Sequence, residues 1–266
     1  MIGQKKLLEK LNTYNIDNFP RSVMLLGEAG CGKHELLNYI QNNILKISML
    51  DITENISAEY IDKIMLNPNP RIYVIDLSKI TEKDENVLLK FIEEPLKTSF
   101  IILLAESRNG ILNTILNRCI LFEFEQYSRD ELRSFVKDKD TEELVLNIVR
   151  TPGKIKSLDV NILSKIYDTC ISIATRLTSA SYANTLTIVN KINYKDESDK
   201  YDINIFFDTL VYVLFKTYLN NSDIRIYNMY IYTIEQRKKL IDKRLNKELF
   251  MTNFISNLWK VVRKND

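Results

Sequence analysis

A glycine-rich segment followed by a lysine has the residue types and spacing of a phosphate-binding loop (P-loop). Its residues are Gly27, Glu28, Ala29, Gly30, Cys31, Gly32, Lys33 and His34. Glycines in such a loop let backbone N–H groups converge on phosphate oxygens at a helix N-terminus, while the lysine reaches the β and γ phosphates. An apolar run precedes the segment and a helical pattern follows it, which disfavours a chance glycine turn. The segment therefore predicts a site for ATP or ADP.

Position 34 departs from this pattern. A P-loop usually has a serine or threonine there, whose hydroxyl holds Mg²⁺, whereas this chain has His34. Mg²⁺ prefers hard oxygen ligands to an imidazole nitrogen. We therefore expect Mg²⁺ to be held poorly at this site.

A second candidate for the nucleotide site is Asp76, which ends the apolar run Arg71-Ile-Tyr-Val-Ile-Asp76. An aspartate after a buried strand is the usual second half of a P-loop nucleotide site and lies near Mg²⁺. The alternative is a carboxylate that caps the next turn. Leu77 follows, where an active member of this class carries a glutamate that acts on the attacking water, and loss of a general base costs roughly 10²–10⁴ in rate. We therefore expect poor ATP hydrolysis by the chain alone, whereas nucleotide binding through Lys33 does not need that glutamate.

Five short apolar runs lie between helical patterns in the first half of the chain. They cover residues 23–26, about 47–52, 72–75, 100–104 and 120–124. Such runs, without clean polar alternation, are typical of parallel strands covered on both faces. Thr81, with Asp84 three residues on, opens one of the helices between them, and Pro95 ends it. The sequence predicts an α/β fold with a parallel five-stranded sheet.

The pattern changes at Ser128. Ser128 and Glu131 have the spacing of a capping box ahead of a helix, and only helical patterns follow, including long amphipathic stretches at 205–219 and about 227–262. The sequence thus predicts three domains. These are a P-loop domain at 1–127 and two all-α domains at 128–160 and 161–266.

Composition excludes several protein classes. Hydrophobic residues make up 45% and charged residues 27% of the chain, and no run approaches the roughly 18 apolar residues of a membrane span. The N-terminus has no apolar signal core, so we expect a soluble cytoplasmic protein. The three cysteines are far apart, which predicts neither zinc nor a disulfide framework.

The net charge of +2 excludes a strongly basic protein that coats DNA. A local basic face remains open on one late helical stretch, although a solvated helix surface is the favoured interpretation. Its residues are Arg237, Lys238, Lys239, Lys243, Arg244 and Lys247.

Several segments together resemble the AAA+ clamp-loader subunits. Asn117-Arg118-Cys119 is similar to the Ser-Arg-Cys segment of that family, with Asn117 in place of serine, and Asn86 to Pro95 is similar to its Asn-Ala-Leu-Leu-Lys-x-Leu-Glu-Glu-Pro helix. Ile2-Gly3-Gln4 resembles the family's opening, and residues 244–258 resemble the last helix region of the bacterial delta-prime subunit. In that family the arginine enters the ATP site of the adjacent subunit. An arginine supplied in this way is worth roughly 10³–10⁵ in rate, and the resemblance therefore implies that Arg118 is an arginine finger.

Within this family, Leu77 and the altered P-loop favour the delta-prime type over the ATP-hydrolysing gamma or tau type. Two features depart from the family. The four-cysteine zinc module is missing, and no arginine matches the second sensor, for which Lys154 and Lys156 are the nearest groups. A short bacterial or phage-encoded delta-prime fits both departures.

The resemblance implies a helical lid at 128–160, a helical collar at 161–266 and a role as a stator that helps to load the sliding clamp onto primed DNA. The implied partners are delta, gamma or tau subunits, the sliding clamp and primer-template DNA, which would be contacted through its phosphates and without sequence specificity. Two alternatives stay open. One is an active motor ATPase working as a homo-oligomer, and the other is a nucleotide-free scaffold with a relic P-loop.

Overall fold

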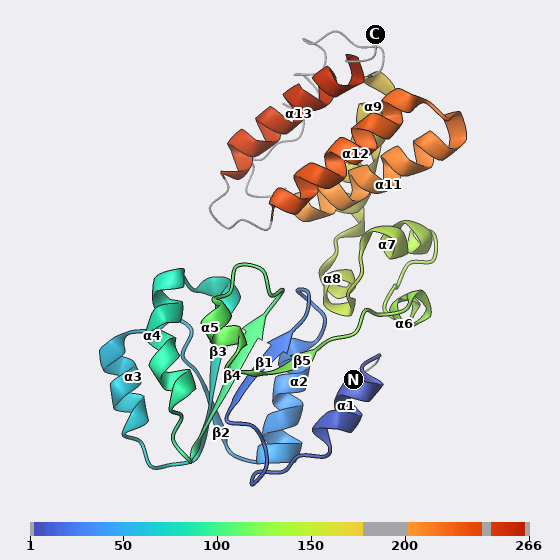
Figure 1. Ribbon diagram of the computed structural model, residues 1–266. Helices are drawn as coiled ribbons and strands as arrows, with labels where there is room; N and C mark the ends of the chain where they lie inside the picture. Colours follow the sequence, from blue (N-terminus) through green and yellow to red (C-terminus); the bar gives the residue numbers. More distant parts are fainter. Residues whose placement is uncertain (1–2, 178–201, 241–245, 264–266) are drawn as a thin grey trace. The chain divides into compact units, whose positions relative to one another are not determined.

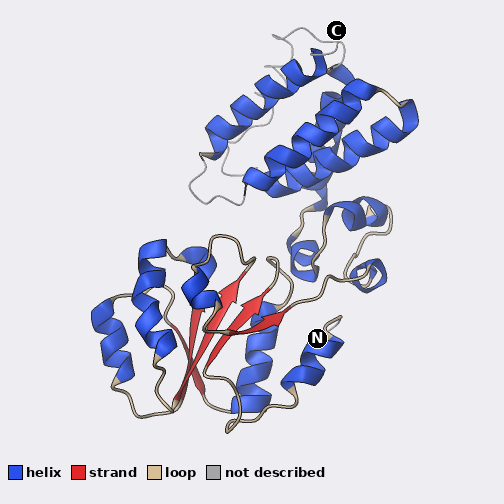
Figure 2. Cartoon of the chain, viewed as in Figure 1, coloured by secondary structure: helices blue, strands red, loops and turns tan. Residues whose placement is uncertain are grey.

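The computed structural model describes residues 3–177, 202–240 and 246–263, and within them the chain forms two compact units. The first unit comprises Met1–Phe135 with Arg150–Lys156, and the second comprises Val136–Val149 with Ser157–Asp266. The first unit contains a sheet between helices, whereas the described part of the second is helical (Figures 1 and 2). The segment predicted as a separate lid, 128–160, is thus shared between the two units. The predicted division into three domains stays a prediction.

The first unit is built on a five-stranded parallel sheet in the order β2-β3-β4-β1-β5. Its strands are β1 (Ser22–Leu26), β2 (Ser48–Asp51), β3 (Arg71–Asp76), β4 (Ser99–Ala105) and β5 (Ile120–Glu123). All five lie where the sequence predicted them, and the α/β fold with a parallel five-stranded sheet is confirmed.

Helices cover each face of this sheet. Successive side chains of a strand point to opposite faces, so each strand packs against helices on both sides. Met24 and Leu26 of β1 pack with the cluster on α3 (Ala58–Met65) and α4 (Glu82–Glu93). Val23 and Leu25 pack instead with α1 (Lys5–Leu11), α2 (Lys33–Tyr39) and the π-helical turn η1 (Ile40–Leu45) that continues α2. Burial on both faces explains why the strands are apolar runs without alternation.

Helix α4 has a capping box at its start. The Thr81 hydroxyl accepts from the Asp84 N–H, and the Asp84 carboxylate accepts from the Thr81 N–H, as the sequence predicted. The hydrogen bonds that the Asp84 carboxylate accepts from the Thr81 N–H and hydroxyl lower the pKa of Asp84. The same arrangement joins Ser128 and Glu131 at the start of α6 (Arg129–Arg133). The first unit is completed by η2 (Leu77–Lys79), α5 (Asn113–Leu116) and most of α8 (Pro152–Ser157).

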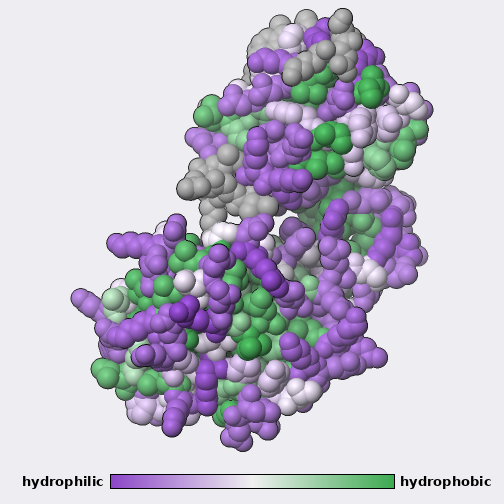
Figure 3. All heavy atoms as spheres, viewed as in Figure 1, coloured by the Kyte–Doolittle hydropathy of each residue, from purple (hydrophilic) through white to green (hydrophobic). Residues whose placement is uncertain are grey.

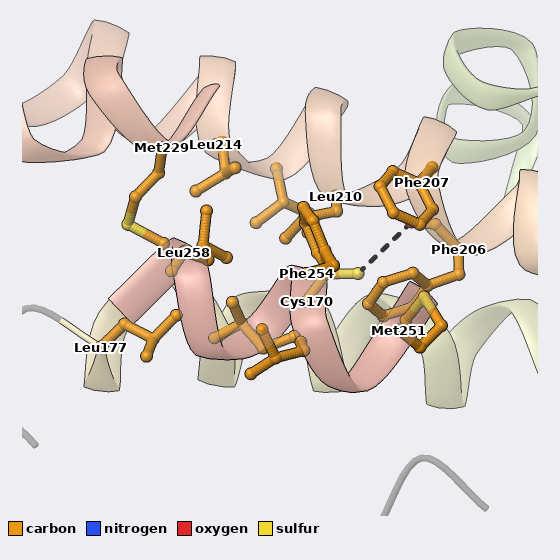
Figure 4. Close-up of a cluster of buried hydrophobic side chains, with 14 of the residues drawn as sticks. Cys170, Leu177, Phe206, Phe207, Leu210, Leu214, Met229, Met251, Phe254 and Leu258 are labelled. Atoms are coloured by element: carbon orange, nitrogen blue, oxygen red, sulfur yellow. Dashed lines mark hydrogen bonds between the residues drawn. The ribbon is translucent and has the colours of Figure 1, made fainter. Parts of the chain in front are cut away.

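The second unit has an apolar core between long helices. Its described elements are α7 (Glu142–Ile148), α9 (Val160–Arg176), α11 (Ile203–Asn221), α12 (Ile224–Lys239) and α13 (Lys247–Arg263). Phe206 and Phe207 of α11 meet Phe254 of α13 and Cys170 of α9 in this core (Figure 4). The Cys170 thiol lies 3.9 Å from the Phe206 carbonyl oxygen and is fully buried, which raises its pKa.

Of the late basic residues, Arg237 is not free. The stretch predicted at about 227–262 contains two helices, α12 and α13, and Lys243 and Arg244 lie outside the described residues. Arg237 is engaged within the unit, because its guanidinium donates to both carboxylate oxygens of Asp208 at 2.9 and 3.2 Å. Part of this charge is therefore used to join α12 to α11.

Polar side chains cover most of the face seen in Figure 3, with apolar residues showing among them. No helix in the described ranges is both long and apolar enough to span a membrane.

The packing of α4 on the sheet gives a test of the first unit's core. Phe91 is fully buried, and its ring meets the Tyr73 ring edge-on at a centroid distance of 5.4 Å. We expect Phe91→Ala to lower the free energy of unfolding by about 3–5 kcal/mol, because it removes an aromatic side chain and leaves a cavity. Urea unfolding measures the change. Leu66→Ala, at an 83% exposed position, is the control and is expected to stay within about 0.5 kcal/mol of wild type.

Candidate functional site

The P-loop and Asp76 lie at the same edge of the sheet. Leu25 of β1 pairs with Leu104 of β4, and Leu104 pairs with Asp76 at the end of β3. The P-loop begins just beyond Leu26, so it starts about two strand spacings, or roughly 10 Å, from Asp76. The carboxyl edge of a parallel sheet is where ligands bind in open α/β folds. The structure therefore brings the two halves of the predicted site to one edge.

Two glycines of the loop have backbone conformations that favour glycine. Gly30 has φ +77° and Gly32, which precedes α2, has φ +104°. Residues with a Cβ rarely adopt these values, because the side chain would clash with the backbone. The glycine pattern found in the sequence is thus required by the shape of the loop itself.

Every carbonyl from Gly27 to Cys31 accepts a hydrogen bond. Lys33 Nζ donates to the Gly27 and Glu28 oxygens at 2.5 and 3.2 Å. The Cys31 N–H also donates to Glu28, at 3.2 Å. The other carbonyls accept from the Thr151 hydroxyl (to Ala29, 2.8 Å), the Gly153 N–H (to Gly30, 2.9 Å) and the Tyr127 hydroxyl (to Cys31, 2.7 Å). These contacts fix the orientation of five consecutive peptide planes.

The N–H groups of the loop are arranged differently from its carbonyls. Within the described residues, the backbone N–H groups of five loop residues donate to no acceptor. These residues are Glu28, Ala29, Gly30, Gly32 and Lys33. A series of successive backbone N–H groups left open in this way fits an anion such as a phosphate group. The loop backbone therefore suits the phosphates of a nucleotide, although the Lys33 ammonium is directed to the loop's own carbonyls.

The loop is also in direct backbone contact with the start of α8. A Cβ on Gly153 would lie only 2.6 Å from Gly30 Cα, and a Cβ on Gly30 would lie 2.8 Å from the Lys154 nitrogen. Neither position has room for a larger residue without movement of the backbone. Thr151-Pro152-Gly153, which appeared in the sequence only as an interruption between helices, is thus packed against the P-loop.

The N-terminal segment supports the loop from another side. The side-chain amide of Gln4 is fully buried and both donates to the Glu125 carbonyl and accepts from its N–H, each at 2.9 Å. A Cβ on Gly3 would lie 2.7 Å from the Tyr127 ring, so glycine lets the chain pass closely behind this tyrosine. Burial raises the pKa of Tyr127, whose hydroxyl donates to Cys31. The roles of Gln4 and Tyr127 were not predicted from the sequence.

Asp76 is engaged in local structure. One of its oxygens accepts from the Ser78 N–H at 3.0 Å and from the Ser78 hydroxyl at 2.6 Å, which caps η2. This is the alternative that the sequence left open for this residue. Its other oxygen faces the cationic Nζ of Lys79 at 3.9 Å.

Leu77 is buried at 2% exposure within the apolar cluster under α4. The position that carries a glutamate in active members is therefore part of the core. His34 is exposed in the first turn of α2, and its ring makes no hydrogen bond within the described part of the chain. Neither residue supplies a carboxylate or hydroxyl for Mg²⁺ or for the attacking water.

Cys31 and Cys119 are buried thiols without a disulfide partner. Burial raises the pKa of Cys31, and it raises the pKa of Cys119 to about 12. Both are protonated at neutral pH and have little of the thiolate that nucleophilic chemistry requires. Their contribution is to packing beside the loop and ahead of β5.

Arg118 lies between α5 and β5 and is held by two contacts. One guanidinium nitrogen donates to the Thr114 carbonyl at 2.8 Å, and the other lies 2.9 Å from a carboxylate oxygen of Glu93. Its side chain is 39% exposed. Glu93 appeared in the sequence only as part of the helix that resembles clamp loaders, so its contact with Arg118 is a new finding.

Arg118 and the chain's own P-loop lie at opposite edges of the sheet. Ile120 of β5 pairs with Val23 of β1, and the P-loop begins four residues beyond Val23. At the rise of a parallel strand this is roughly 13 Å along the sheet, and Arg118 lies on the far side of Ile120. The structure thus does not bring Arg118 together with Lys33 and Asp76.

Comparisons with known proteins agree with this architecture. Residues 32–128 match the family model described as DNA polymerase III, delta subunit. The DNA polymerase III subunit delta' of Bacillus subtilis (strain 168) is 32% identical over 95 residues, which are 35% of this chain and 28% of that protein. The chain thus matches less than a third of the length of this relative. Over this segment, the predicted resemblance to an AAA+ clamp-loader subunit of the delta-prime type is confirmed.

A solved structure shares the fold. A DNA polymerase III gamma subunit-related protein from Thermotoga maritima superposes with a TM-score of 0.51 at 16% identity, covering 97% of this chain and 99% of that one. A RuvB variant from Thermotoga maritima gives a TM-score of 0.47 at 18% identity, with 81% and 75% of the two chains covered.

The contact between Gly30 and Gly153 predicts a strong effect of a single methyl group. We expect Gly153→Ala to displace the start of α8 from the P-loop, because the added Cβ would overlap the Gly30 backbone, and to cost about 1–3 kcal/mol of stability. Amide hydrogen exchange of residues 150–156 should become faster. Thr151→Ser, which keeps the hydroxyl donor to Ala29, is the control, and unchanged exchange in Gly153→Ala would contradict the contact.

The burial of Leu77 predicts that a glutamate at this position does not create an ATPase. We expect Leu77→Glu to lower the free energy of unfolding, by on the order of 3–5 kcal/mol, because it places an unpaired carboxylate in the apolar cluster. Unfolding and ATP turnover of the purified chain measure the two effects. Leu77→Met keeps the volume and is expected to cost less than about 1.5 kcal/mol. A stable Leu77→Glu chain that hydrolyses ATP would contradict this account.

Proposed function

We propose that this chain, whose P-loop unit resembles AAA+ clamp-loader subunits of the delta-prime type, is a clamp-loader stator that supplies Arg118 to the ATP site of a neighbouring subunit. In this proposal, the chain helps to load the sliding clamp onto primed DNA without being an efficient ATPase itself. Its chemical contribution is one guanidinium, placed where negative charge develops on the phosphate that a neighbour transfers.

The observation that carries this proposal is the position of Arg118 at the edge of the sheet opposite the P-loop. Arg118 lies on the far side of Ile120, which is roughly 13 Å along the sheet from the start of the chain's own P-loop. Its guanidinium is partly exposed and, among the residues that the structure describes, contacts only Thr114 and Glu93. An arginine in this position is suited to act on a nucleotide held by another subunit.

The chain's own site supports weak or absent hydrolysis. Leu77 is a core residue, and one oxygen of Asp76 is already bonded to Ser78. If ATP or ADP binds, the open N–H groups of Glu28, Ala29, Gly30, Gly32 and Lys33 would hold its phosphates, and Asp76 is the carboxylate candidate for Mg²⁺. Lys33 would first have to leave the Gly27 and Glu28 carbonyls. Each of these features favours slow chemistry over a motor role.

The proposed partners follow from the clamp-loader type. They are subunits of the delta and gamma or tau kind, the sliding clamp and primer-template DNA. Contact with DNA would be through its phosphates, by lysines and helix N-termini, and would therefore weaken with salt and ignore sequence.

A nucleotide-free scaffold is a second candidate, and specific contacts favour it. The Lys33 ammonium and the Gly153 N–H already satisfy loop carbonyls, so the P-loop keeps its shape without phosphate. Calorimetry with Mg²⁺-ATP and Mg²⁺-ADP separates the two. Binding that is lost in Lys33→Ala supports a nucleotide-holding stator, and absence of binding supports the scaffold. Steady ATP turnover by the purified chain would instead support the motor ATPase.

The arginine-finger role predicts a loss of ATPase without a loss of assembly. The complex is isolated from the source cells through a tag on this chain, and its DNA-stimulated ATP turnover is measured with wild-type chain and with Arg118→Ala. We expect hydrolysis at the one site that this chain serves to fall by roughly 10³-fold or more, while the same partners co-purify. Lys90→Ala is the control, because it also removes one positive charge from an exposed ion pair, which Lys90 forms with Asp62 of α3. Unchanged turnover in Arg118→Ala would exclude the role.

A further inference from the structure

We propose that Glu93 is a positioning residue for Arg118, which keeps the guanidinium ordered and correctly aimed before a neighbouring nucleotide is present. This inference rests on the proposed role of Arg118 as an arginine finger. It assigns to the carboxylate at the end of α4 a function that the sequence alone did not suggest.

Two contacts determine the orientation of the guanidinium plane. One nitrogen donates to the Thr114 carbonyl of α5, and the other meets the Glu93 carboxylate of α4. Because a guanidinium is rigid and planar, contacts at both terminal nitrogens fix its position and its rotation. The first contact is local to α5, whereas the second ties the arginine to a different helix. Glu93 therefore sets the direction of the side chain relative to the body of the unit.

Helix α4 is a suitable support because it is anchored in the core. Leu88, Phe91 and Ile92 are all buried beneath it. Near its other end, Glu85 is 3% exposed and accepts a hydrogen bond at 3.0 Å from the N–H of Leu112, which precedes α5. Carboxylates near both ends of α4 thus hold the two ends of the short segment that carries Arg118.

The arrangement leaves room for an anion. An arginine has five N–H donors, and two are engaged here. The side chain is 39% exposed, so the free donors can meet phosphate oxygens while Glu93 stays in place. A long side chain that is already ordered loses less conformational freedom when the neighbour docks, which lowers the cost of reaching the transition-state geometry.

The exposure of the Glu93–Arg118 ion pair separates a positioning role of Glu93 from a stabilising one. The Glu93 side chain is 42% exposed, and ion pairs between partly exposed groups contribute little to folding stability. Loss of Glu93 is therefore expected to leave the fold and the assembly intact and to change the aim of Arg118. Glu94, the next residue, is exposed and its side chain makes no interaction within the described residues, so it provides a matched control for the loss of one negative charge.

The test uses the complex purified through this chain, with Glu93→Ala, Glu93→Gln, Glu94→Ala, Arg118→Ala and the double variant Glu93→Ala with Arg118→Ala. We expect Glu93→Ala to lower kcat at the one ATP site that this chain serves by about 10- to 100-fold, the range for a misplaced catalytic group, with KM for ATP unchanged. Glu93→Gln keeps a carbonyl oxygen that can accept from the guanidinium and should fall between Glu93→Ala and wild type. Glu94→Ala should match wild type, and the double variant should match Arg118→Ala.

Each other outcome overturns the inference in a recognisable way. If Arg118→Ala lowers ATP turnover and Glu93→Ala does not, Arg118 is a finger that needs no support from Glu93. Faster turnover in Glu93→Ala or Glu93→Gln would mean that the carboxylate restrains the arginine instead of aiming it. A further fall in the double variant below Arg118→Ala would show that Glu93 acts on the structure and not through Arg118. If Arg118→Ala itself has no effect, the proposed function and this inference fall together.

Discussion

The parallel direction of the five strands is the constraint on which the rest of the first unit depends. In a parallel sheet all carboxyl ends meet at one edge and all amino ends at the other. Segments that follow strands, such as the P-loop after β1 and Asp76 at the end of β3, therefore gather together. Arg118 precedes a strand and for that reason lies at the opposite edge. One topological feature thus divides the unit into a nucleotide edge and an arginine edge.

Local patterns in the sequence were sufficient to predict most of this framework. The strands were found because burial on both faces makes each a continuous apolar run, and the starts of α4 and α6 were found because the capping pairs Thr81 with Asp84 and Ser128 with Glu131 are three residues apart. The positions of Leu77 and His34 could likewise be read from the spacing of the motif. What these predictions share is that each depends on residues close together in the chain.

Contacts between distant segments could not be predicted in this way. Glu93 and Arg118 meet because α4 and α5 pack on the same face of the sheet, and no spacing between them signals the pair. The same holds for Tyr127 with Cys31 and for the double hydrogen bond of Gln4 to Glu125. For Asp76 the sequence left two interpretations, and only the geometry shows that one oxygen caps η2. The finer features of the site are thus properties of the fold and not of the motifs.

These contacts also change what the P-loop glycines indicate. Gly30 adopts a positive φ and touches the backbone of Gly153, so a Cβ would be excluded at this position even if no nucleotide ever bound. Lys33 is likewise engaged with the loop's own carbonyls. The motif is therefore explained by the conformation of the loop and by its contact with α8, independently of ATP. The loop's open N–H groups, and not its glycines, are the feature that specifically fits a phosphate, and any claim that the chain binds nucleotide has to rest on them.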